Sequence, residues 1–449
     1  STQAKTLFPY TTLFRSLFKA SKVLIPVIMV LSILIDYTHG LLVEKYRSRD
    51  KLARWFVAES VLLNLGLLGF FKYWDFFAAN LSLIPGVSIS ALGLPLPIGI
   101  SFFTFTQIAF LADAYAGKVT EYRFIYYVLF VTYFPHLIAG PVLHHKEMMP
   151  QFDEDRNYRP HAANFAIGLT IFAIGLAKKV LIADSLAPMG TVILGSSEPQ
   201  MVDAWFGMLI CLLQLYFDFS GYSDMAIGLG MMMGFRFAEN FNQPLLCQSL
   251  TEFWRRWHLT LADFLRDYIY VPLVRSKRVS ADGALFCTML LSGFWHGASF
   301  AYIFFGLYFA VLMVAERRLG LVTKIGGPYK WWRNLLALIF VVGVMPFFIT
   351  GDMQHALRIV PAMLGFNGIG SLDVYLLATS QMTLAFTLVA VAWLLLAGRL
   401  NLRFYAGAQQ GYWMQHVGGL SMLALWAAFG LSLSRLAANS FSPFLYFQF

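Results

Sequence analysis

The sequence predicts an all-α, polytopic membrane protein. Of its 449 residues, 58% are hydrophobic and only 13% are charged, and the mean hydropathy is +0.64. Soluble domains carry about 25% charged residues, so this chain has about half of the charged residues that a protein with a water-facing surface usually has. Apolar stretches long enough to cross about 30 Å of hydrocarbon as helices, roughly 17–25 residues each, recur along the chain. Lipid is therefore the expected solvent of this fold.

The apolar stretches give the order of the expected membrane-spanning helices. They lie near residues 23–43, 56–79, 123–140, 163–183, 203–217, 284–296, 298–315, 332–350, 376–397 and 415–434. A further apolar segment, residues 94–115, opens with Pro95, Pro97 and Gly99, so we expect it to be re-entrant or half-length. Irregular backbone survives at membrane depth only where protein or a water-filled cavity covers it, which indicates an interior cavity.

The charged residues indicate how the chain is oriented. The formal net charge is +9, and the loop 44–54 alone carries five Lys or Arg and two acidic residues. Lys and Arg collect in short cytoplasmic loops, so we expect this loop in the cytoplasm, with 275–278 and 316–318 as candidates for the same side. No basic run is interleaved with polar recognition residues, which disfavours a nucleic-acid groove. The three cysteines form no CxxC pair, so neither a disulfide framework nor a thiol–metal site is expected.

We expect a single membrane domain over residues 17–449. The chain shows no internal repeat, no low-complexity tract and no polar linker long enough to introduce a second domain. Residues 1–16, STQAKTLFPYTTLFRS, lack an initiating Met and the apolar core of a signal peptide. They look like a translated sequencing adapter, and we predict that this segment is not native.

A polar cluster interrupts the most apolar part of the chain. Residues 204–235 would be roughly 48 Å long as one helix at 1.5 Å per residue, which is too long for one straight crossing. The polar residues in its middle are Asp218, Ser220, Tyr222, Ser223 and Asp224. Carboxylates in hydrocarbon usually face a bundle interior or a pathway, because each is costly there unless paired or wetted. The alternative is a helix break in which Asp218 or Ser220 caps the next helix.

An amphipathic helix is expected to begin at the capping box formed by Ser249 and Glu252. The residues that share its apolar-aromatic face are Trp254, His258, Leu261 and Leu265. Arg255 and Arg256 fall mostly off that face, so the helix should lie in the membrane interface rather than span. His258 would point inward, either as a satisfied core histidine or as a functional one.

A second histidine, His296, lies between two apolar segments, next to Trp295 and Gly297. An imidazole is costly at this depth, and no structural task for it is visible in the sequence. It is either hydrogen-bonded to a neighbouring carbonyl or a functional base, since imidazole titrates near neutrality and can take a proton from a hydroxyl. The adjacent His144 and His145 would point about 100° apart on a helix and make a poor metal pair, so we expect loop residues and no metal site.

Five ordered segments resemble the membrane-bound O-acyltransferase superfamily. They are FPHLIAGPVLHH (134–145), DFSGYSDMAIGLGMMMGFRFAENFNQP (218–244), LTEFWRRWHLTLADFLRDYIYVPL (250–273), SGFWHGASF (292–300) and SPFLYFQF (442–449). Within the superfamily, the resemblance is greatest to bacterial membrane subunits that O-acetylate alginate and other cell-envelope polysaccharides, and it covers residues 20–449. It implies a multi-helix bundle around a central tunnel. The family's invariant histidine corresponds to His296, and its second motif histidine to His258.

The resemblance implies an O-acyltransferase with two catalytic histidines. His296 would act as general base on an acceptor hydroxyl, and His258 would orient the acceptor or stabilise charge on the tetrahedral intermediate. Arg255 and Arg256 would either attract a phosphorylated donor such as acetyl-CoA or contact lipid headgroups. Asp218 and Asp224 are expected to hold the tunnel wall together rather than to perform chemistry. The other expected tunnel or substrate-binding residues are Ser220, Tyr222, Ser223, Asn240, Trp254, Trp257, Trp295 and Gly297.

The resemblance also implies partners and a location. We expect acetyl to pass from a cytoplasmic thioester, acetyl-CoA, across the bacterial cytoplasmic (inner) membrane to an exopolysaccharide such as alginate, with no bound cofactor. An extracytoplasmic, esterase-like transferase would carry the group onward. Relatives acting on peptidoglycan, or in teichoic-acid D-alanyl transfer, share these motifs and leave the acceptor open. A proton-coupled transporter of a small metabolite or glycan precursor is the rival class, and a scaffold for polysaccharide export is a third.

Overall fold

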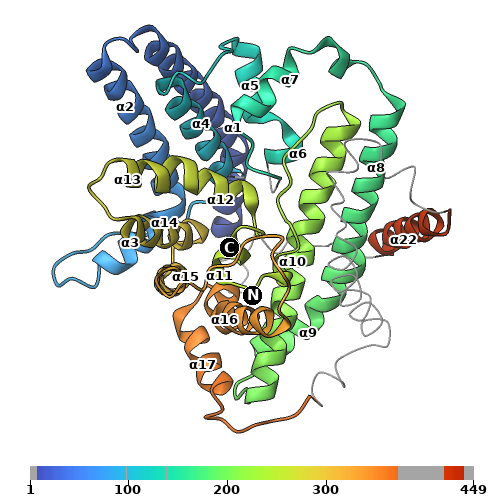
Figure 1. Ribbon diagram of the computed structural model, residues 1–449. Coiled ribbons are helices and arrows are strands. Elements are labelled where there is room, and N and C mark those ends of the chain that lie inside the picture. Colours follow the sequence, from blue (N-terminus) through green and yellow to red (C-terminus); the bar gives the residue numbers. More distant parts are fainter. Residues whose placement is uncertain (1–7, 98, 138–139, 373–418, 439–449) are drawn as a thin grey trace. The chain divides into compact units, whose positions relative to one another are not determined.

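Every regular element in the described part of the chain is a helix. The structure is a computed structural model, and it describes residues 8–97, 99–137, 140–372 and 419–438 (Figure 1). The chain divides into two compact units. The first comprises Ser1–Ile138 and His144–Asp153, and the second comprises Ala139–Leu143 and Glu154–Phe449. Each unit has its own set of packed helices.

The first unit is built on α1, α2 and α4. Its elements are α1 (Phe8–Lys45), α2 (Asp50–Leu68), the π-helical turn η1 (Gly69–Tyr73), α3 (Trp74–Leu81), α4 (Ile100–Tyr115), α5 (Phe124–Thr132), α6 (Phe134–Leu137) and α7 (His145–Phe152). Buried polar side chains join the three main helices. Asp36 of α1 accepts hydrogen bonds from Ser60 and Asn64 of α2, and Ser32 of α1 donates to Gln107 of α4 at 2.7 Å. In lipid such groups need partners within the bundle, so these contacts fix how the helices pack.

The first unit corrects two predictions from the sequence. The segment 94–115 is irregular at its start, because α4 begins only at Ile100, after Gly99 in the left-handed conformation (φ 75°), but with 16 residues α4 is longer than the predicted half-length helix. The run 123–140, predicted as one span, is broken: α5 ends at Thr132, Tyr133 is extended (ψ 104°), and a separate short helix, α6, follows. Pro135 explains the break, since proline has no N–H to donate to the carbonyl four residues back and its ring crowds that carbonyl.

The adjacent histidines of this unit are buried, which the loop prediction missed. His145 is the first residue of α7, and the side chains of His144 and His145 are both buried. The ring of His145 lies edge-on to Phe110 at 5.8 Å, and its Nδ1 is 3.6 Å from the carboxylate of Asp113. Burial lowers the pKa of His145 to about 4, so this histidine is neutral in the folded chain.

The second unit pairs two long helical columns with a stack of further helices. Its elements are η2 (Asp155–Tyr158), α8 (Ala162–Ala177), the π-helical turn η3 (Lys178–Ala183), α9 (Asp184–Gly195), α10 (Met201–Met232), η4 (Pro244–Leu246), α11 (Leu250–Trp254), α12 (Leu259–Leu265), the π-helical turn η5 (Arg266–Tyr270), α13 (Val271–Arg275), α14 (Ala281–His296), α15 (Phe300–Arg318), α16 (Trp331–Thr350), α17 (Met353–Met363) and α22 (Gly419–Ala438). The column α8–η3–α9 runs alongside α10 (Figure 1).

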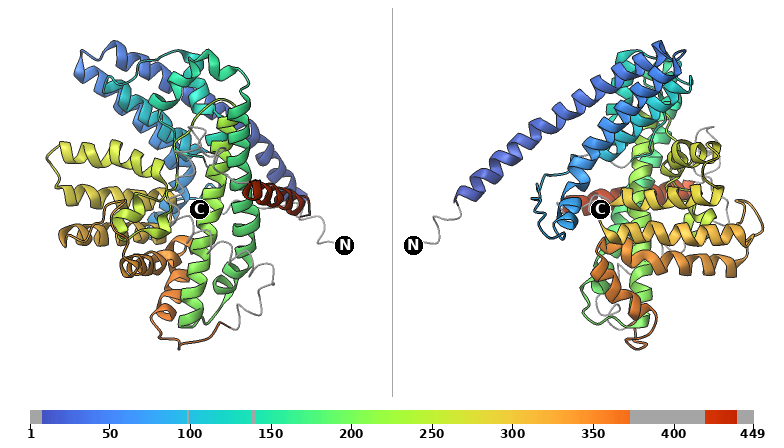
Figure 2. Two further views of the ribbon diagram at one scale, coloured as in Figure 1. Left: turned by 45° about the vertical axis from the view of Figure 1, so that its right-hand side comes forward. Right: turned by 90° about the vertical axis from the view of Figure 1, so that its left-hand side faces the viewer.

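Glycines let the long columns approach each other. A Cβ on Gly175 of α8 would lie 2.5 Å from the carbonyl oxygen of Gly221 of α10, and one on Gly168 would lie 2.5 Å from that of Gly228. Small residues at this spacing are typical of membrane helix pairs, where close backbone approach replaces the hydrophobic driving force. In the same unit α14, α15 and α16 lie side by side (Figure 2).

The helices confirm a multi-pass membrane protein. Six helical segments of the described part are long and apolar enough to cross a membrane: Pro26–Lys45, Asp50–Leu81, Ala162–Gly195, Met201–Met232, Phe300–Arg318 and Trp331–Thr350. The expected span 376–397, residues 415–418 and the closing motif 442–449 lie outside the described residues, whereas α22 covers most of the expected span 415–434. The single domain over 17–449 and the non-native segment 1–16 stay predictions.

Candidate active site

His258 lies in a tight turn between α11 and α12, and not on the face of a continuous helix. The predicted helix does begin as expected, because Ser249 caps α11 by accepting a hydrogen bond from the backbone N–H of Glu252 at 3.1 Å. It ends after Trp254, and His258 adopts a left-handed backbone with φ 46°. The continuous amphipathic helix was therefore a wrong prediction. Its interruption directs the imidazole of His258 inward, where it is 1% exposed.

Asn240 holds the turn and fixes the imidazole. Its backbone carbonyl accepts the N–H of Leu259 at 2.9 Å, and its side-chain oxygen lies 2.9 Å from Nδ1 of His258 and 3.0 Å from the hydroxyl of Thr260. An amide oxygen only accepts, so Nδ1 carries the proton and Nε2 bears the lone pair. Burial lowers the pKa of His258 to about 3, which keeps this ring neutral.

Residues on α10 contact both His258 and its hydrogen-bond partner Asn240. The amide nitrogen of Asn240 donates to the hydroxyl of Ser223 at 3.1 Å, and the ring of Phe219 meets the imidazole of His258 edge-on at 4.8 Å. The polar cluster of α10 is thus divided between neighbouring faces. Ser223 belongs to the face that positions Asn240, as expected for a residue near the site.

The two aspartates of the cluster face the column α8–η3–α9 and form buried ion pairs with it. Asp218 is 2.6 Å from the ammonium of Lys179, and Asp224 is 2.6 Å from that of Lys178. Helix α10 is continuous from Met201 to Met232, so the alternative of a helix break at this cluster was wrong. These pairs fit the expected role of holding helices together.

His296 closes α14 at the start of a glycine turn. It is 5% exposed, and Gly297 after it is extended, with a position at which any Cβ would overlap the ring of Tyr302. The ring of His296 contacts Phe348 at 5.0 Å and Phe305 at 6.1 Å, both edge-on. Gly297 therefore lets α15 fold back closely enough for its aromatic residues to pack on the imidazole.

The two histidines flank one indole. The ring centroid of Trp295 is 6.3 Å from that of His258 and 4.9 Å from that of His296. The imidazoles therefore belong to one cluster, although they come from segments nearly forty residues apart.

A small cavity opens beside His296. It is narrow, with about 20 Å³ of space that a water molecule can reach, and it is partly open to the surroundings. Its lining residues are Leu212, Leu215, Phe253, Trp254, Trp257, His296, Phe305, Phe309, Val341, Met345 and Phe348. The walls are apolar except for ring nitrogens, which come from Trp254, Trp257 and His296. His258 and Trp295 are not among the lining residues, whereas their neighbours in the sequence, Trp257 and His296, are.

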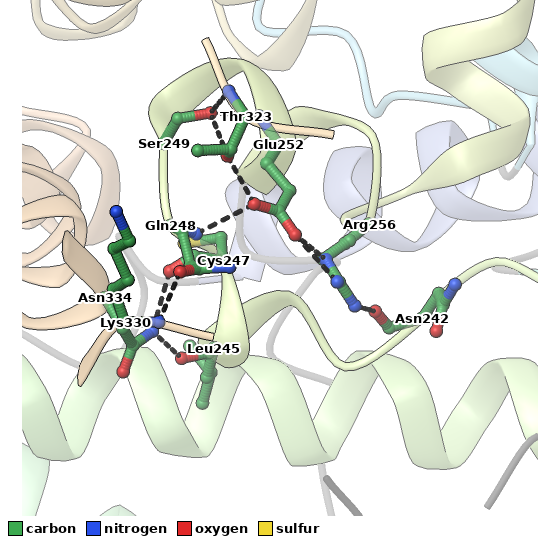
Figure 3. Close-up of polar contacts among 10 residues, drawn as sticks. All are labelled: Asn242, Leu245, Cys247, Gln248, Ser249, Glu252, Arg256, Thr323, Lys330 and Asn334. Atoms are coloured by element: carbon green, nitrogen blue, oxygen red, sulfur yellow. Dashed lines mark hydrogen bonds and ion pairs between the residues drawn. The ribbon is translucent and has the colours of Figure 1, made fainter. Parts of the chain in front are cut away.

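A buried polar network anchors the segment that carries Trp254 and His258 (Figure 3). Glu252, 1% exposed, accepts two hydrogen bonds from Arg256, at 2.9 and 2.7 Å, one from the backbone of Gln248 at 3.0 Å and one from Thr323 at 2.5 Å. The hydroxyl of Ser249 accepts a further bond from Thr323 at 3.0 Å. The short helix α11 is therefore fixed to the segment that follows α15.

A second set of bonds ties the same segment to α15 and α16. The side-chain nitrogen of Asn334 donates to the carbonyls of Leu245 and Cys247, at 2.8 and 2.7 Å (Figure 3). Glu316 accepts the backbone N–H groups of Leu250 at 2.7 Å and Thr251 at 2.9 Å. A carboxylate at a helix N-terminus satisfies donors that have no partner within the helix. Residues 245–256 are thus held on both sides.

The two predicted arginines differ in their surroundings. Arg256 is bound to Glu252 and to the carbonyl of Asn242, and its side chain is only 12% exposed. Arg255 is exposed. Of the two, Arg255 therefore has the guanidinium that is accessible to a soluble anion.

Basic residues gather at one end of the α14–α15 hairpin. Arg318 at the end of α15 donates to Asp282 at the start of α14 at 2.8 Å, and Glu316 brings the start of α11 to the same end. The exposed basic residues near this end are Arg255, Arg275, Lys277, Arg278, Arg317, Arg318, Lys324 and Lys330. His296, the last residue of α14, lies toward the opposite end. Residues 275–278 and 316–318 therefore lie at the same end of the α14–α15 hairpin, and their position on the cytoplasmic side stays a prediction.

Several residues around the site were not predicted from the sequence. Lys178 and Lys179 could have been found, because two cations inside the apolar run 163–183 need anionic partners. Glu316 and Asn334 carry no local signal, since their partners are distant in the sequence. Among the described residues no group of three or more His, Cys, Asp or Glu is arranged to hold a metal ion.

The fold and the site define a polytopic membrane enzyme with a histidine at an apolar cavity, and the chain belongs to the membrane-bound O-acyltransferase family. The family model, MBOAT, matches residues 6–349. The chain is therefore an acyltransferase, and the transporter and scaffold alternatives are not supported.

Three relatives show which members of the family the chain is similar to. "Probable alginate O-acetylase AlgI" of Pseudomonas aeruginosa is 38% identical, over 92% of this chain and 89% of the relative. The protein of the same name from Pseudomonas putida is 40% identical, over 92% and 88%. "Peptidoglycan O-acetyltransferase" of Helicobacter pylori is 36% identical, over 76% and 70%.

Proposed function

We propose that this chain moves an acetyl group from acetyl-CoA on the cytoplasmic side toward the O-acetylation of an extracytoplasmic polysaccharide such as alginate. The observation that carries the proposal is the apolar cavity bounded by His296, with His258 on the other side of Trp295. Relatives named for alginate O-acetylation, 38–40% identical over 92% of the chain, support this acceptor class. The membrane would be the bacterial cytoplasmic (inner) membrane.

His296 is the general base in this proposal. It takes the proton of the acceptor hydroxyl as the oxygen attacks the thioester carbonyl. The new C–O bond forms, the C–S bond breaks, and the proton passes from the imidazole to the departing thiolate of CoA. A positioned base of this kind contributes about 10²–10⁴-fold to the rate.

His258 orients the acceptor in this proposal. Its Nδ1–H is directed to Asn240, so Nε2 is the atom able to accept a hydrogen bond from a hydroxyl. Because burial lowers the pKa of His258 to about 3, the ring is neutral, which favours the orienting role over stabilisation of negative charge.

The basic end of the hairpin receives the donor in this proposal. Positively charged loops face the cytoplasm in membrane proteins, and the phosphates of CoA bind guanidinium groups through charge-assisted hydrogen bonds. Arg255 is exposed at this end and is the residue that we assign to the donor phosphates. An extracytoplasmic transferase would supply the acceptor hydroxyl and pass the acetyl group to the glycan.

The test is thioester turnover by the purified protein in lipid nanodiscs. With an alginate oligosaccharide added to supply the acceptor hydroxyl, we expect acetyl-CoA to release free CoA as the oligosaccharide is acetylated, and His296→Ala to abolish that release while the protein still folds. The exposed His161 gives a matched control, because His161→Ala changes a histidine away from the site and should leave turnover unchanged. Full CoA release by His296→Ala would refute the assignment of the base.

A further inference from the structure

Trp254 holds a buried hydrogen-bond donor at the cavity. It is the last residue of α11, it is 8% exposed, and it lines the cavity together with His296. Its ring is fixed edge-on against Phe309 at 5.2 Å and against Phe305 at 6.3 Å. The indole Nε1 has no hydrogen-bond acceptor among the residues that the structure describes.

A buried N–H without an acceptor is costly, and native proteins keep few of them. The residues that line the cavity with Trp254 are apolar, apart from Trp257 and His296. An indole N–H only donates, so it cannot take a proton from the acceptor or compete with His296 for that role. An acceptor brought by the substrate would satisfy this N–H.

The acyl carbonyl is the acceptor that the reaction brings to this cavity. In an apolar enclosure a thioester carbonyl loses its water, and during attack its oxygen gains negative charge. Fixed donors aimed at such an oxygen are usually the largest electrostatic contribution to acyl transfer, provided that they do not reorganise. Trp254 meets this condition, because Glu252, Thr323 and Glu316 anchor α11 on both sides.

We propose that the Nε1–H of Trp254 donates a hydrogen bond to the acyl carbonyl oxygen and to the oxyanion that forms from it. The inference rests on the proposed function and deepens it, because it assigns the substrate's acyl end to the cavity beside His296. His296 moves the proton, and Trp254 stabilises the charge on the carbonyl oxygen.

The test replaces Trp254 by 3-benzothienylalanine, which keeps the shape of the indole and puts sulfur in place of the N–H. Turnover of acetyl-CoA is measured in nanodiscs, with thermal unfolding as the check on folding. We expect kcat to fall about 10²–10³-fold with KM for acetyl-CoA nearly unchanged, because the bond strengthens in the transition state.

A matched control is available at Trp205, whose indole N–H donates to the carbonyl of Met363 at 2.8 Å, away from the cavity. The same replacement there should lower thermal stability and leave kcat unchanged. Unchanged kcat with the isostere at 254, while His296→Ala is inactive, would overturn the inference and leave the proposed function standing. A rise in KM alone would also overturn it, and wild-type protein that releases no CoA would remove both.

Discussion

Replacing Glu252 by glutamine should disturb the site from outside the cavity. The carboxylate is buried and accepts bonds from Arg256, Gln248 and Thr323, whereas a glutamine of the same shape carries no charge. The guanidinium of Arg256 would then be left without its anion in a half-buried position. Removing one partner of a buried ion pair costs about 3–5 kcal/mol, so we expect a loss of this size in the free energy of unfolding.

The loss of this anchor should also lower activity. Trp254 and His258 follow Glu252 on the same anchored segment, and a displacement of about 1 Å at a reacting group can cost about 10²-fold in rate. We therefore expect Glu252→Gln to reduce kcat by up to about 10²-fold, with CoA release in nanodiscs as the assay. Denaturant unfolding in mixed micelles gives the change in stability.

Two further variants make the reasoning refutable. Adding Arg256→Met to Glu252→Gln removes both charges, so the double variant should be more stable than Glu252→Gln alone. Asp263→Asn breaks an exposed pair with Arg266 and should cost less than about 1 kcal/mol. If the double variant is no more stable than Glu252→Gln, the unpaired charge of Arg256 is not the cause of the lost stability. Lost stability with unchanged kcat would show that the network does not position the site.

Three other predictions follow from the structure. Lys179→Met strands the buried carboxylate of Asp218 and removes the ion pair with Asp184, so it should cost about 3–5 kcal/mol in unfolding free energy, and adding Asp218→Leu should recover the part that is due to Asp218. Phe309→Ala enlarges the cavity, so turnover of butyryl-CoA should rise relative to acetyl-CoA, at a cost in stability of about 3–5 kcal/mol. Burial lowers the pKa of His145 to about 4, below its ordinary 6.5, so the unfolded chain binds more protons between these values and stability falls as pH falls. His145→Gln should remove about 3 kcal/mol of this acid dependence, at 1.36 kcal/mol per pH unit, and the exposed His161→Gln should not.

Each of these predictions has an opposing result. If adding Asp218→Leu lowers the free energy of unfolding further than Lys179→Met alone, the two residues do not stabilise the fold as an ion pair. An unchanged ratio of butyryl to acetyl turnover in Phe309→Ala would place the acyl group elsewhere. Equal acid dependence in wild type and His145→Gln, measured by unfolding from pH 7 to pH 4, would show that another group titrates.

Local signals in the sequence predicted the elements that depend on near neighbours. The hydrophobic content gave the membrane class, and the capping box gave the start of α11, because Ser249 and Glu252 interact across three residues. The end of that helix was not predictable in the same way. The spacing of Trp254, His258 and Leu261 fits a continuous helix, but the carbonyl of Asn240 takes the N–H of Leu259 at 2.9 Å and opens the turn.

The partners of the intramembrane carboxylates were predictable in kind but not in register. Two lysines in an apolar run require two anions, and the sequence offers Asp218 and Asp224. Which lysine meets which aspartate depends on the π-helical turn that begins at Lys178 and on the contact between Gly175 and Gly221. Neither feature follows from hydrophobic periodicity.

The left-handed backbone at His258 determines which substitutions allow folding, independently of which ones allow catalysis. With φ 46°, the position excludes β-branched residues on steric grounds, and it suits Gly, Asn and Asp better than most others. In a saturation library screened only for membrane insertion and folding, Asn and Gly should therefore outlast Val and Ile at this position. Screening the same library for turnover would separate residues that the turn tolerates from those that the reaction can use.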